Sequence, residues 1–501
     1  MIPFWCYNII VGRIMFNNLL AFCYGVFIVI FIAVQLFIVE DVSAANKEKI
    51  YTLENDATAR NLAAGVTIRN GKPLYMYGQT QNQAGNILPF ITRLDNNLNS
   101  TWGRYAVFYG KSSGGFDRIL DSRFVSGVSE NGFDSSGNPL TSSHFVGAEI
   151  NDDSGIYVKM LDDGTFSVKK NYHLTNSRVM LRHIHLVGNN RAMLVGTVYD
   201  KVQNSNFGLL VMQIDTSTGA VIFSKVIDRG LMFGLGTLAA FDKSTNNLIV
   251  AFAHTGGPQL KLLKIDLAGN VVFSNEYLLP TTISSSVFPF VFLGGDLLID
   301  KDNNLVIAGV LRTIPTSTSV YHTGFIIKLQ QSGNVSFYKE YVVDSFPGWP
   351  FKYGTVLSPI QTTDGNYVVS GAANYPIHGN NTWFMRRVLL KVNSNNGNII
   401  WKRGYREESF TTHNRVVELP NKTLASTSGQ WEYKITVTDA NGNGSCMLHP
   451  VSPPIIAYNL TPAAVQPFSV TSLNVGLKVI DLKHENGKVV NIKTDDKCTY
   501  P

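Results

Sequence analysis

Two histidines lie two residues apart in the segment Arg182-His183-Ile184-His185. Side chains at this spacing point to the same face of a strand, so the two imidazole rings could begin a metal site. A structural zinc site requires four ligands, and no cluster of cysteines or histidines nearby completes the set. We therefore expect hydrogen-bonded or solvent-facing histidines, and we assign no metal ligands.

The segment Asp300-Lys301-Asp302-Asn303-Asn304 alternates carboxylate and amide oxygens, as calcium-binding loops do. A complete calcium loop also supplies a glycine for its sharp turn and a distant glutamate. This segment lacks that arrangement and directly precedes a run of strand-forming residues. We therefore expect a hairpin turn here.

The segment Gly110-Lys111-Ser112-Ser113-Gly114 matches the G-x-S-x-G pattern of a nucleophilic serine. That serine requires a sharp strand-to-helix turn in an α/β sheet. The residues around it instead favour antiparallel strands. We therefore expect a loop between sheets and assign no catalytic residue.

The segment Asp162-Asp163-Gly164-Thr165-Phe166 resembles the Asp-box turn of sialidase propellers. A sialidase also needs an arginine triad and a tyrosine nucleophile backed by a carboxylate. A single sequence does not show whether such residues converge. We expect a turn here and again assign no catalytic residue.

The strands and turns around these segments belong to a sequence pattern that repeats along the chain. The phrases at 246–253 (NNLIVAFA), 303–310 (NNLVIAGV) and 365–372 (GNYVVSGA) are near copies. Each leads to a strand that contains lysine, a turn rich in Asp, Asn and Gly, and a strand that contains an aromatic residue. Seven copies are found, at intervals of 49 to 69 residues, and their marker positions are Gly78, Gly147, Gly196, Phe252, Gly309, Gly371 and Gly429.

Each copy also has an upstream strand, as at 236–242, 293–300, 355–362 and 414–420. Four antiparallel strands per repeat are one blade of a β-propeller. The sequence thus predicts an all-β fold, a β-propeller of seven four-stranded blades. Small residues in the second strand would allow close backbone approach near the channel. The aromatic residues of the last strand are expected to pack between blades, and examples are Trp102, Phe273, Phe337 and Trp401.

The repeat is similar to that of bacterial quinoprotein-type (PQQ-like) β-propellers. The segments at 215–223 (DTSTGAVIF) and 393–401 (NSNNGNIIW) carry this resemblance, which covers roughly residues 60–450. It implies a fold more than an activity, because the motif is a packing motif. Quinone-dependent enzymes of this type have more blades, and many have adjacent cysteines. This chain has no adjacent cysteines, and we assign no cofactor.

The first 45 residues differ from the rest. Leu19–Val39 is an almost uninterrupted apolar run long enough to span a bilayer as a helix. With Arg13 before it and Glu40 and Asp41 after it, the run predicts an N-terminus in the cytoplasm and an exported remainder. A cleaved signal peptide and an uncleaved membrane anchor are both compatible with the pattern.

Two cysteines, Cys446 and Cys498, lie beyond this leader, near the C-terminus. In an oxidising compartment they are candidates for a disulfide that would hold the C-terminal tail against the last repeat. Free thiols are the alternative.

The sequence divides into a leader (1–45), a propeller (46–450) and a C-terminal segment (451–501) that is either a β tail or part of a terminal blade. The net charge is +6 without a basic run, so we expect no nucleic-acid partner. We favour an exported, non-catalytic binding or scaffold module for a protein or glycan partner. It would be secreted, periplasmic or membrane-anchored through Leu19–Val39. The alternatives are a propeller enzyme that acts on sugars or uses a quinone, and a scaffold for envelope assembly. Contact surfaces are expected in the long inserts 110–140, 280–292 and 312–323.

Overall fold

A computed structural model gives the fold. The described residues lie between 48 and 496, with breaks at 54–61, 70–71, 82–85, 96–97, 99, 106, 112–116, 120–121, 131–140, 150–153, 202–206, 232, 255–256, 283–286, 294–296, 317–318, 344–350, 378–379, 406–414, 429–432, 445–454, 462–463, 468–471, 475–476, 482, 486–488 and 491. The predicted leader, Cys446 and Cys498 lie outside them. No helix in the described part is long and apolar enough to cross a membrane.

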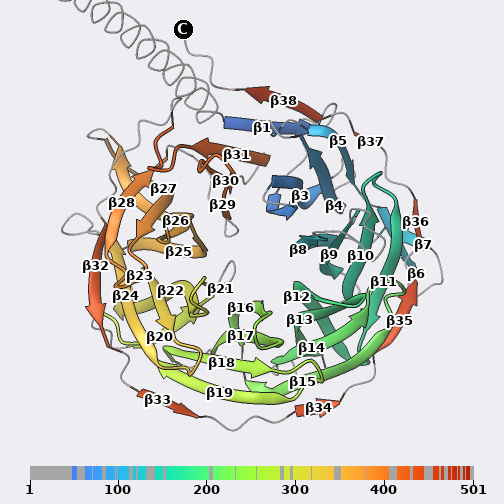
Figure 1. The fold of residues 1–501 in the computed structure, drawn as a ribbon, viewed down its shortest axis with the longest axis horizontal. Coiled ribbons are helices and arrows are strands. Elements are labelled where there is room, and N and C mark those ends of the chain that lie inside the picture. The colour runs from blue at the N-terminus through green and yellow to red at the C-terminus, as the bar shows by residue number, and fades with distance from the viewer. Residues whose placement is uncertain are drawn as a thin grey trace, which may run out of the picture.

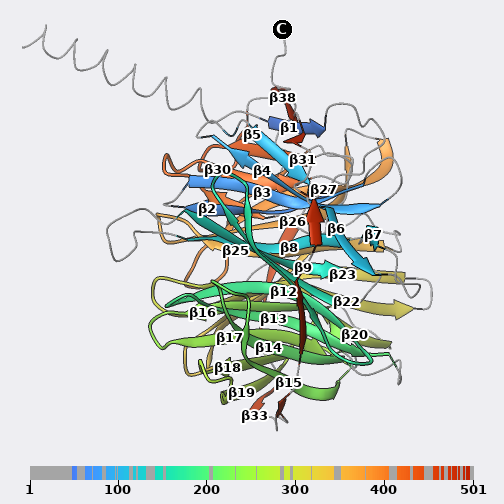
Figure 2. The same ribbon diagram turned by 90° about the vertical axis from the view of Figure 1, so that its right-hand side faces the viewer.

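Seven four-stranded antiparallel blades stand in a ring around a central axis, which confirms the predicted seven-bladed propeller (Figure 1). We number the blades along the chain, and in the side view blades 1, 2 and 3 follow one another from top to bottom (Figure 2). The strands of blades 1 to 4, from the innermost outward, are β2 (Leu62–Arg69), β3 (Lys72–Gln81), β4 (Ile87–Leu94) and β5 (Ser100–Tyr105); β8 (Ser122–Ser129), β9 (Ser142–Glu149), β10 (Ser154–Leu161) and β11 (Phe166–His173); β12 (Ser177–Gly188), β13 (Arg191–Asp200), β14 (Phe207–Asp215) and β15 (Val221–Leu231); and β16 (Phe233–Asp242), β17 (Asn247–His254), β18 (Gln259–Ile265) and β19 (Val271–Leu278).

Blade 5 has a divided innermost strand, and blade 7 takes its fourth strand from the other end of the chain. Because β1 pairs with β31, the N-terminal strand closes the ring. The strands of these blades are β20 (Val287–Phe292) with β21 (Leu298–Ile299), β22 (Leu305–Thr316), β23 (Ser319–Leu329) and β24 (Val335–Val343); β25 (Phe351–Gln361), β26 (Tyr367–Ile377), β27 (Asn380–Val392) and β28 (Ile399–Gly404); and β29 (Val416–Glu418), β30 (Leu424–Ser428), β31 (Tyr433–Thr438) and β1 (Glu48–Leu53).

The C-terminal segment runs around the outside of the ring (Figure 1). It adds a fifth antiparallel strand to blades 5, 4, 3, 2, 1 and 7 in turn, and it pairs with a small extra sheet between blades 1 and 2. Each added strand covers backbone groups that an outermost strand would otherwise leave unpaired. The segment contains β32 (Ile455–Leu460), β33 (Ala464–Pro467), β34 (Ser472–Asn474), β35 (Lys478–Asp481), β36 (Lys483–Glu485), β37 (Val489–Val490) and β38 (Ile492–Asp496), and the extra sheet pairs β36 with β6 (Val107–Lys111) and β7 (Asp117–Ile119).

The two ends of the ring differ in their connections. At the end that we call the turn end, short turns join first to second strands and third to fourth strands, except that 130–141 joins β8 to β9. At the other, the loop end, lie the second-to-third connections and the links between blades. The extra sheet β6–β7–β36 belongs to one such link, and β22 and β23 extend far enough for β23 to pair with β25 of the next blade. The extra sheet and the extended hairpin therefore both lie at the loop end.

A repeated hydrogen bond joins neighbouring blades at the turn end. A buried tyrosine at or just beyond the end of an outermost strand donates its hydroxyl to the carbonyl of a turn glycine in the next blade. Burial raises the pKa of each of these tyrosines, so all stay neutral donors. The four pairs are Tyr172 with Gly219 (2.9 Å), Tyr277 with Gly333 (2.8 Å), Tyr341 with Gly397 (2.7 Å) and Tyr405 with Gly442 (2.8 Å).

Three of these four glycines also meet an aromatic ring of the preceding blade, whereas Gly219 meets Lys170 and Val168 instead. Phe337 lies so close to Gly397 that an added Cβ would come within 2.7 Å of its ring. Phe273 meets Gly333 and Trp401 meets Gly442 in the same way. Trp102 packs against Tyr75, with ring centroids 5.8 Å apart, and against the core that blades 1 and 2 share. The predicted packing of last-strand aromatic residues between blades is confirmed.

The predicted repeat is confirmed strand by strand. The six described marker residues all lie in second strands, and the predicted upstream strands form the innermost strands or parts of them. The expected inserts were partly wrong. Strands β7, β8 and β20 occupy much of 110–140 and 280–292, and residues 312–323 form the tip of the β22–β23 hairpin. Strand β7 has only three residues and β8 mixes polar with apolar residues, so neither stands out as a strand in the sequence.

We predict that Tyr341→Phe lowers the free energy of unfolding by about 1–3 kcal/mol, since it leaves the buried carbonyl of Gly397 without its donor. Denaturant titration of the purified chain measures this. The control is Tyr458→Phe on β32, whose side chain is 39% exposed and whose replacement should change stability little. Equal effects of the two substitutions would contradict a role for the blade-to-blade bond.

We predict that Gly397→Ala destabilises the chain by more than the strain of its left-handed backbone alone. Gly397 has φ of 70°, and an added Cβ would lie 2.7 Å from both Phe337 and Lys339. Gly188 is the matched control, because it has φ of 85° with nothing within 4 Å of such a Cβ. Gly188→Ala should show only the backbone term, on the order of 1–3 kcal/mol. A smaller loss for Gly397→Ala than for Gly188→Ala would refute the clash.

Candidate functional site

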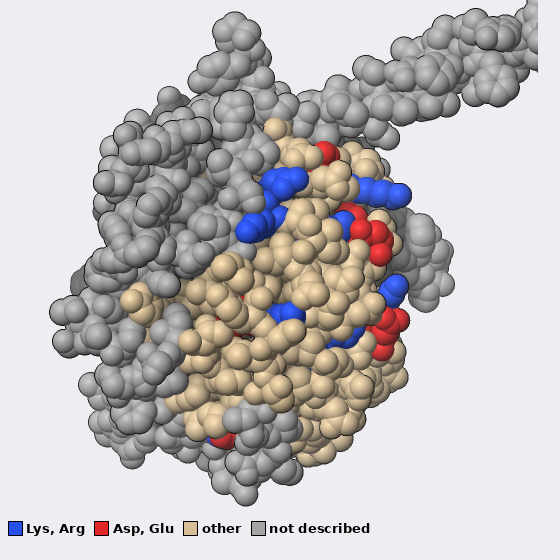
Figure 3. Space-filling model, turned by 90° about the vertical axis from the view of Figure 1, so that its left-hand side faces the viewer, with Lys and Arg blue, Asp and Glu red and all other residues tan. Residues whose placement is uncertain are grey.

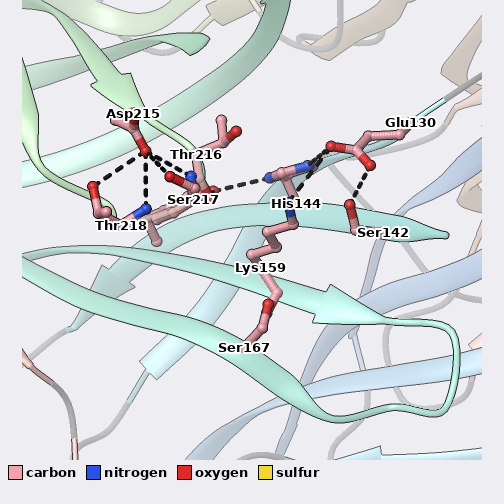
Figure 4. A network of polar contacts seen from close by, with 10 residues as sticks. Glu130, Ser142, His144, Lys159, Ser167, Asp215, Thr216, Ser217 and Thr218 are labelled. Carbon is pink, nitrogen blue, oxygen red and sulfur yellow. Dashed lines mark hydrogen bonds and ion pairs between the residues drawn. The ribbon is translucent and has the colours of Figure 1, made fainter. Parts of the chain in front are cut away.

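One connection at the turn end is unusually long. Residues 130–141 join β8 to β9 across twelve positions, whereas the other turns at this end span six residues or fewer. The backbone amide of Glu130 donates to the carbonyl of Ser142 at 2.9 Å, which closes the base of the connection. A group of polar side chains lies at this base, and we call Glu130, Ser142, His144, Tyr157 and Lys159 the blade 2 cluster. Figure 4 labels four of them, Glu130, Ser142, His144 and Lys159.

The imidazole ring of His144 lies at the centre of the blade 2 cluster. Its Nε2 lies 3.0 Å from a carboxylate oxygen of Glu130, and its Nδ1 lies 2.9 Å from the hydroxyl of Tyr157. The side chain is fully buried, and its ring stacks on that of Tyr157 with an interplanar angle of 18°. Both ring nitrogens therefore have partners within blade 2.

Glu130 accepts from several donors at once. Ser142 donates its hydroxyl to the second carboxylate oxygen, and the ammonium of Lys159 lies 3.8 Å from the first. Burial opposes ionisation, but the hydrogen bonds from His144 and Ser142 prevail and lower the pKa of Glu130 to about 2. Burial also lowers the pKa of His144 below 6.5, and the Glu130 contact offsets this only in part. At neutral pH the carboxylate is charged and the imidazole is neutral.

These protonation states limit what the blade 2 cluster can do. A carboxyl group with a pKa near 2 has no proton to donate at neutral pH, so Glu130 does not fit a general acid. His144 has the right type for proton transfer, but its side chain is completely enclosed and cannot touch a substrate. The geometry instead suits a structural role, in which the cluster fixes the two ends of a long connection.

The blade 2 cluster also reaches the next blade. The hydroxyl of Tyr157 lies 3.3 Å from the backbone carbonyl of Thr216, in the turn between β14 and β15. Asp215 holds that turn by accepting from the amides of Ser217 and Thr218 at 2.8 and 3.0 Å. The hydrogen bond from Ser217 is the main cause that lowers the pKa of Asp215. Figure 4 shows His144 between Glu130 and this turn.

Aspartate carboxylates at other turns also accept hydrogen bonds from within their own turns. Asp242, Asp266, Asp300, Asp364 and Asp439 all accept hydrogen bonds from backbone amides or side chains of their own turns. Such Asx-type bonds replace the backbone partners that a tight turn lacks. The acidic residues of the turn end thus stabilise the turns.

Asp300, one of the residues considered for calcium, illustrates this role. Its two oxygens accept from Asn304, from the hydroxyl of Tyr367 in blade 6 (2.6 Å) and from Lys328 (3.1 Å). The predicted hairpin turn is confirmed, and the carboxylate also joins two blades. In the part of the chain that the structure describes, no group of three or more His, Cys, Asp or Glu side chains is placed to hold a metal ion.

The two histidines lie on one face of β12, as their spacing predicted. Their rings are stacked, with centroids 6.4 Å apart and an interplanar angle of 11°. His183 is buried, and its Nε2 contacts the carbonyl of Thr237 in blade 4. This histidine therefore joins blades 3 and 4, in agreement with a hydrogen-bonded structural residue.

The remaining motifs are also placed by the sheets. Gly110 and Lys111 belong to β6, in an antiparallel sheet that differs from the surroundings of a nucleophilic serine, and Ser112 to Gly114 lie outside the described residues. Asp162 begins the turn between β10 and β11, as expected, and its carboxylate accepts a hydrogen bond from the hydroxyl of Tyr75 in blade 1 at 3.2 Å.

The sequence analysis did not find the blade 2 cluster, because Glu130 and His144 are fourteen positions apart in the sequence and only the sheet brings them together. The one signal in the sequence was His144 itself, a titratable residue directly before the apolar run Phe145-Val146 of β9.

Comparison with known proteins adds little beyond the fold. No family model matches the chain, and no curated protein matches it. Among solved structures, it is similar to an intramolecular trans-sialidase from Ruminococcus gnavus (11% identity, 78% of this chain and 98% of that one, TM-score 0.33). It is also similar to an exo-β-1,3-galactanase from Phanerochaete chrysosporium (11%, 89% and 99%, TM-score 0.29) and to a luciferin-regenerating enzyme (11%, 62% and 91%, TM-score 0.27). Similarity this distant assigns no activity, and the resemblance to quinoprotein-type propellers stays a prediction beyond the shared fold.

We predict that acid destabilises the chain partly through Glu130. Its pKa is depressed from 4.5 to about 2, so the unfolded chain binds this proton first and stability falls as pH drops through that interval. In Glu130→Gln the free energy of unfolding should vary less steeply with pH across the same interval. Denaturant titrations at a series of pH values test this, and identical slopes for the two proteins would show that Glu130 is not held as described.

Proposed function

We propose that the chain is an exported binding module that contacts a protein or glycan partner through the loop end of its ring. The difference between the two ends supports this proposal. At the turn end the acidic side chains hold turns and neighbouring blades together. At the loop end the chain adds a sheet, β6–β7–β36, and extends the β22–β23 hairpin. Binding residues of scaffolds are generally carried by such connections on a rigid frame.

The proposal assigns the blade 2 cluster a structural role. Glu130 is held as a carboxylate and His144 is enclosed, so this cluster supplies no general acid at neutral pH and instead holds the two ends of the connection 130–141. The side of the ring drawn in Figure 3 carries scattered charges of both signs over its described surface. Such a surface suits recognition by shape and hydrogen bonding more than by a strong field of one sign.

Cross-linking of the full-length chain on intact source cells tests which end meets the partner. A lysine-reactive reagent should join the partner to Lys201, an exposed residue at the loop end. Exposed lysines at the turn end provide the internal control and should give few such products; they are Lys243, Lys301 and Lys422. Partner cross-links concentrated on the control lysines would overturn the proposal.

Thermal unfolding of the full-length chain with sugars, calcium and pyrroloquinoline quinone tests the enzymatic alternative. A ligand that binds only the folded state stabilises it by about 2.7 kcal/mol at a hundredfold excess over its dissociation constant. Under the proposal, calcium and the quinone leave the midpoint unchanged. A clear upward shift with the quinone would favour a quinone enzyme, and a shift with a sugar would identify the partner class as a glycan.

A further inference from the structure

The hydroxyl of Tyr157 has two acceptors and one proton. It lies 2.9 Å from Nδ1 of His144 within blade 2 and 3.3 Å from the carbonyl of Thr216 in blade 3. The four tyrosines that donate to turn glycines reach those carbonyls at 2.7 to 2.9 Å. The Tyr157 contact is thus the longest of this kind and competes with a bond inside its own blade.

The tautomer of His144 follows from its neighbours. Glu130 is a carboxylate and can only accept, so the Nε2 beside it must carry the ring proton. The Nδ1 of a neutral ring is then a lone-pair acceptor, and it can only receive the hydroxyl proton of Tyr157. In the neutral state the hydroxyl therefore donates to His144, and the carbonyl of Thr216 is left with only a weak, long contact.

A second proton on His144 reverses this arrangement. Nδ1 then becomes a donor, and the oxygen of Tyr157 must accept from it. The hydroxyl proton turns toward the carbonyl of Thr216, the other acceptor within reach. The proton comes from solvent, no covalent bond other than N–H changes, and Tyr157 keeps its own proton because burial raises its pKa.

We propose that protonation of His144 is a switch that moves the Tyr157 hydroxyl bond from blade 2 to the Thr216 carbonyl and so adds a second bond between blades 2 and 3. The charged and titratable groups around the switch come from every packed element. Glu130 at the end of β8 and Lys159 on β10 act on His144, and Tyr172 on β11 and Asp215 in the turn of blade 3 act on Tyr157. Burial and Lys159 oppose the imidazolium and Glu130 favours it, so the switch operates on the acid side of neutrality.

Nuclear magnetic resonance of the full chain, labelled in histidine and in threonine and glycine carbonyls, tests the switch. At neutral pH the His144 ring should carry its proton on Nε2. On acidification Nδ1 should become protonated, and the ¹³C carbonyl resonance of Thr216 should move with the same midpoint. The carbonyl of Gly219 is the internal control, since Tyr172 already binds it at 2.9 Å in the same turn; it should stay fixed.

Tyr157→Phe provides the variant. It should abolish the movement of the Thr216 resonance while the backbone spectrum of the other blades is retained. The titration of the wild-type chain tests the switch by itself, so the test remains valid even if the Tyr157→Phe variant fails to fold. Any of three results would overturn the proposal. These are a proton on Nδ1 of His144 at neutral pH, a Thr216 carbonyl resonance that does not change as His144 titrates, and unfolding of the chain before His144 is protonated.

Discussion

The structure depends on the joint between neighbouring blades. A single four-stranded blade cannot bury both of its faces, so each must be held against the next by contacts that repeat around the ring. The hydroxyl of an outer-strand tyrosine and an aromatic ring both meet one left-handed glycine of the following turn, as Tyr341 and Phe337 do at Gly397. A side chain at that glycine would displace the ring and strain the backbone together. The turn, the outer strand and the spacing of the blades are thereby coupled.

Closure of the ring imposes a second requirement, because the last blade must meet the first. Here β1 completes blade 7, and β38 from the other terminus pairs with the outer edge of β1. The strands β32 to β38 pair along the outer edges of six blades. Unfolding of any of these six blades would therefore also break pairing with a segment from a distant part of the sequence. Pairing between strands far apart in the sequence has a large entropic cost of loop closure, so we expect this fold to form slowly.

The sequence was sufficient for the architecture but not for the long-range contacts. Repeats such as NNLVIAGV and the aromatic positions Phe273, Phe337 and Trp401 follow directly from the requirement that blades pack on one another. The hairpin turn at Asp300 is predictable from its residues, yet its bonds to Tyr367 and Lys328 are not, because they cross between strands and blades. The same limit hid the pairing of Glu130 with His144. A periodic sequence specifies which residues are equivalent, and only the closed ring specifies which of them meet.

Hydrogen–deuterium exchange of the full-length chain tests most directly whether the turn end is the fixed part of the molecule. The amides of Gly219, Gly333, Gly397 and Gly442 all donate within their turns, beside the carbonyls that the tyrosines bind. We expect peptides covering these turns to exchange as slowly as the strands beside them, and more slowly than the loop-end connection at 174–176, where Thr175 and Asn176 are exposed. Exchange at the turns as fast as at 174–176 would contradict a fixed turn end, since the contacts between blades would then open as readily as this connection.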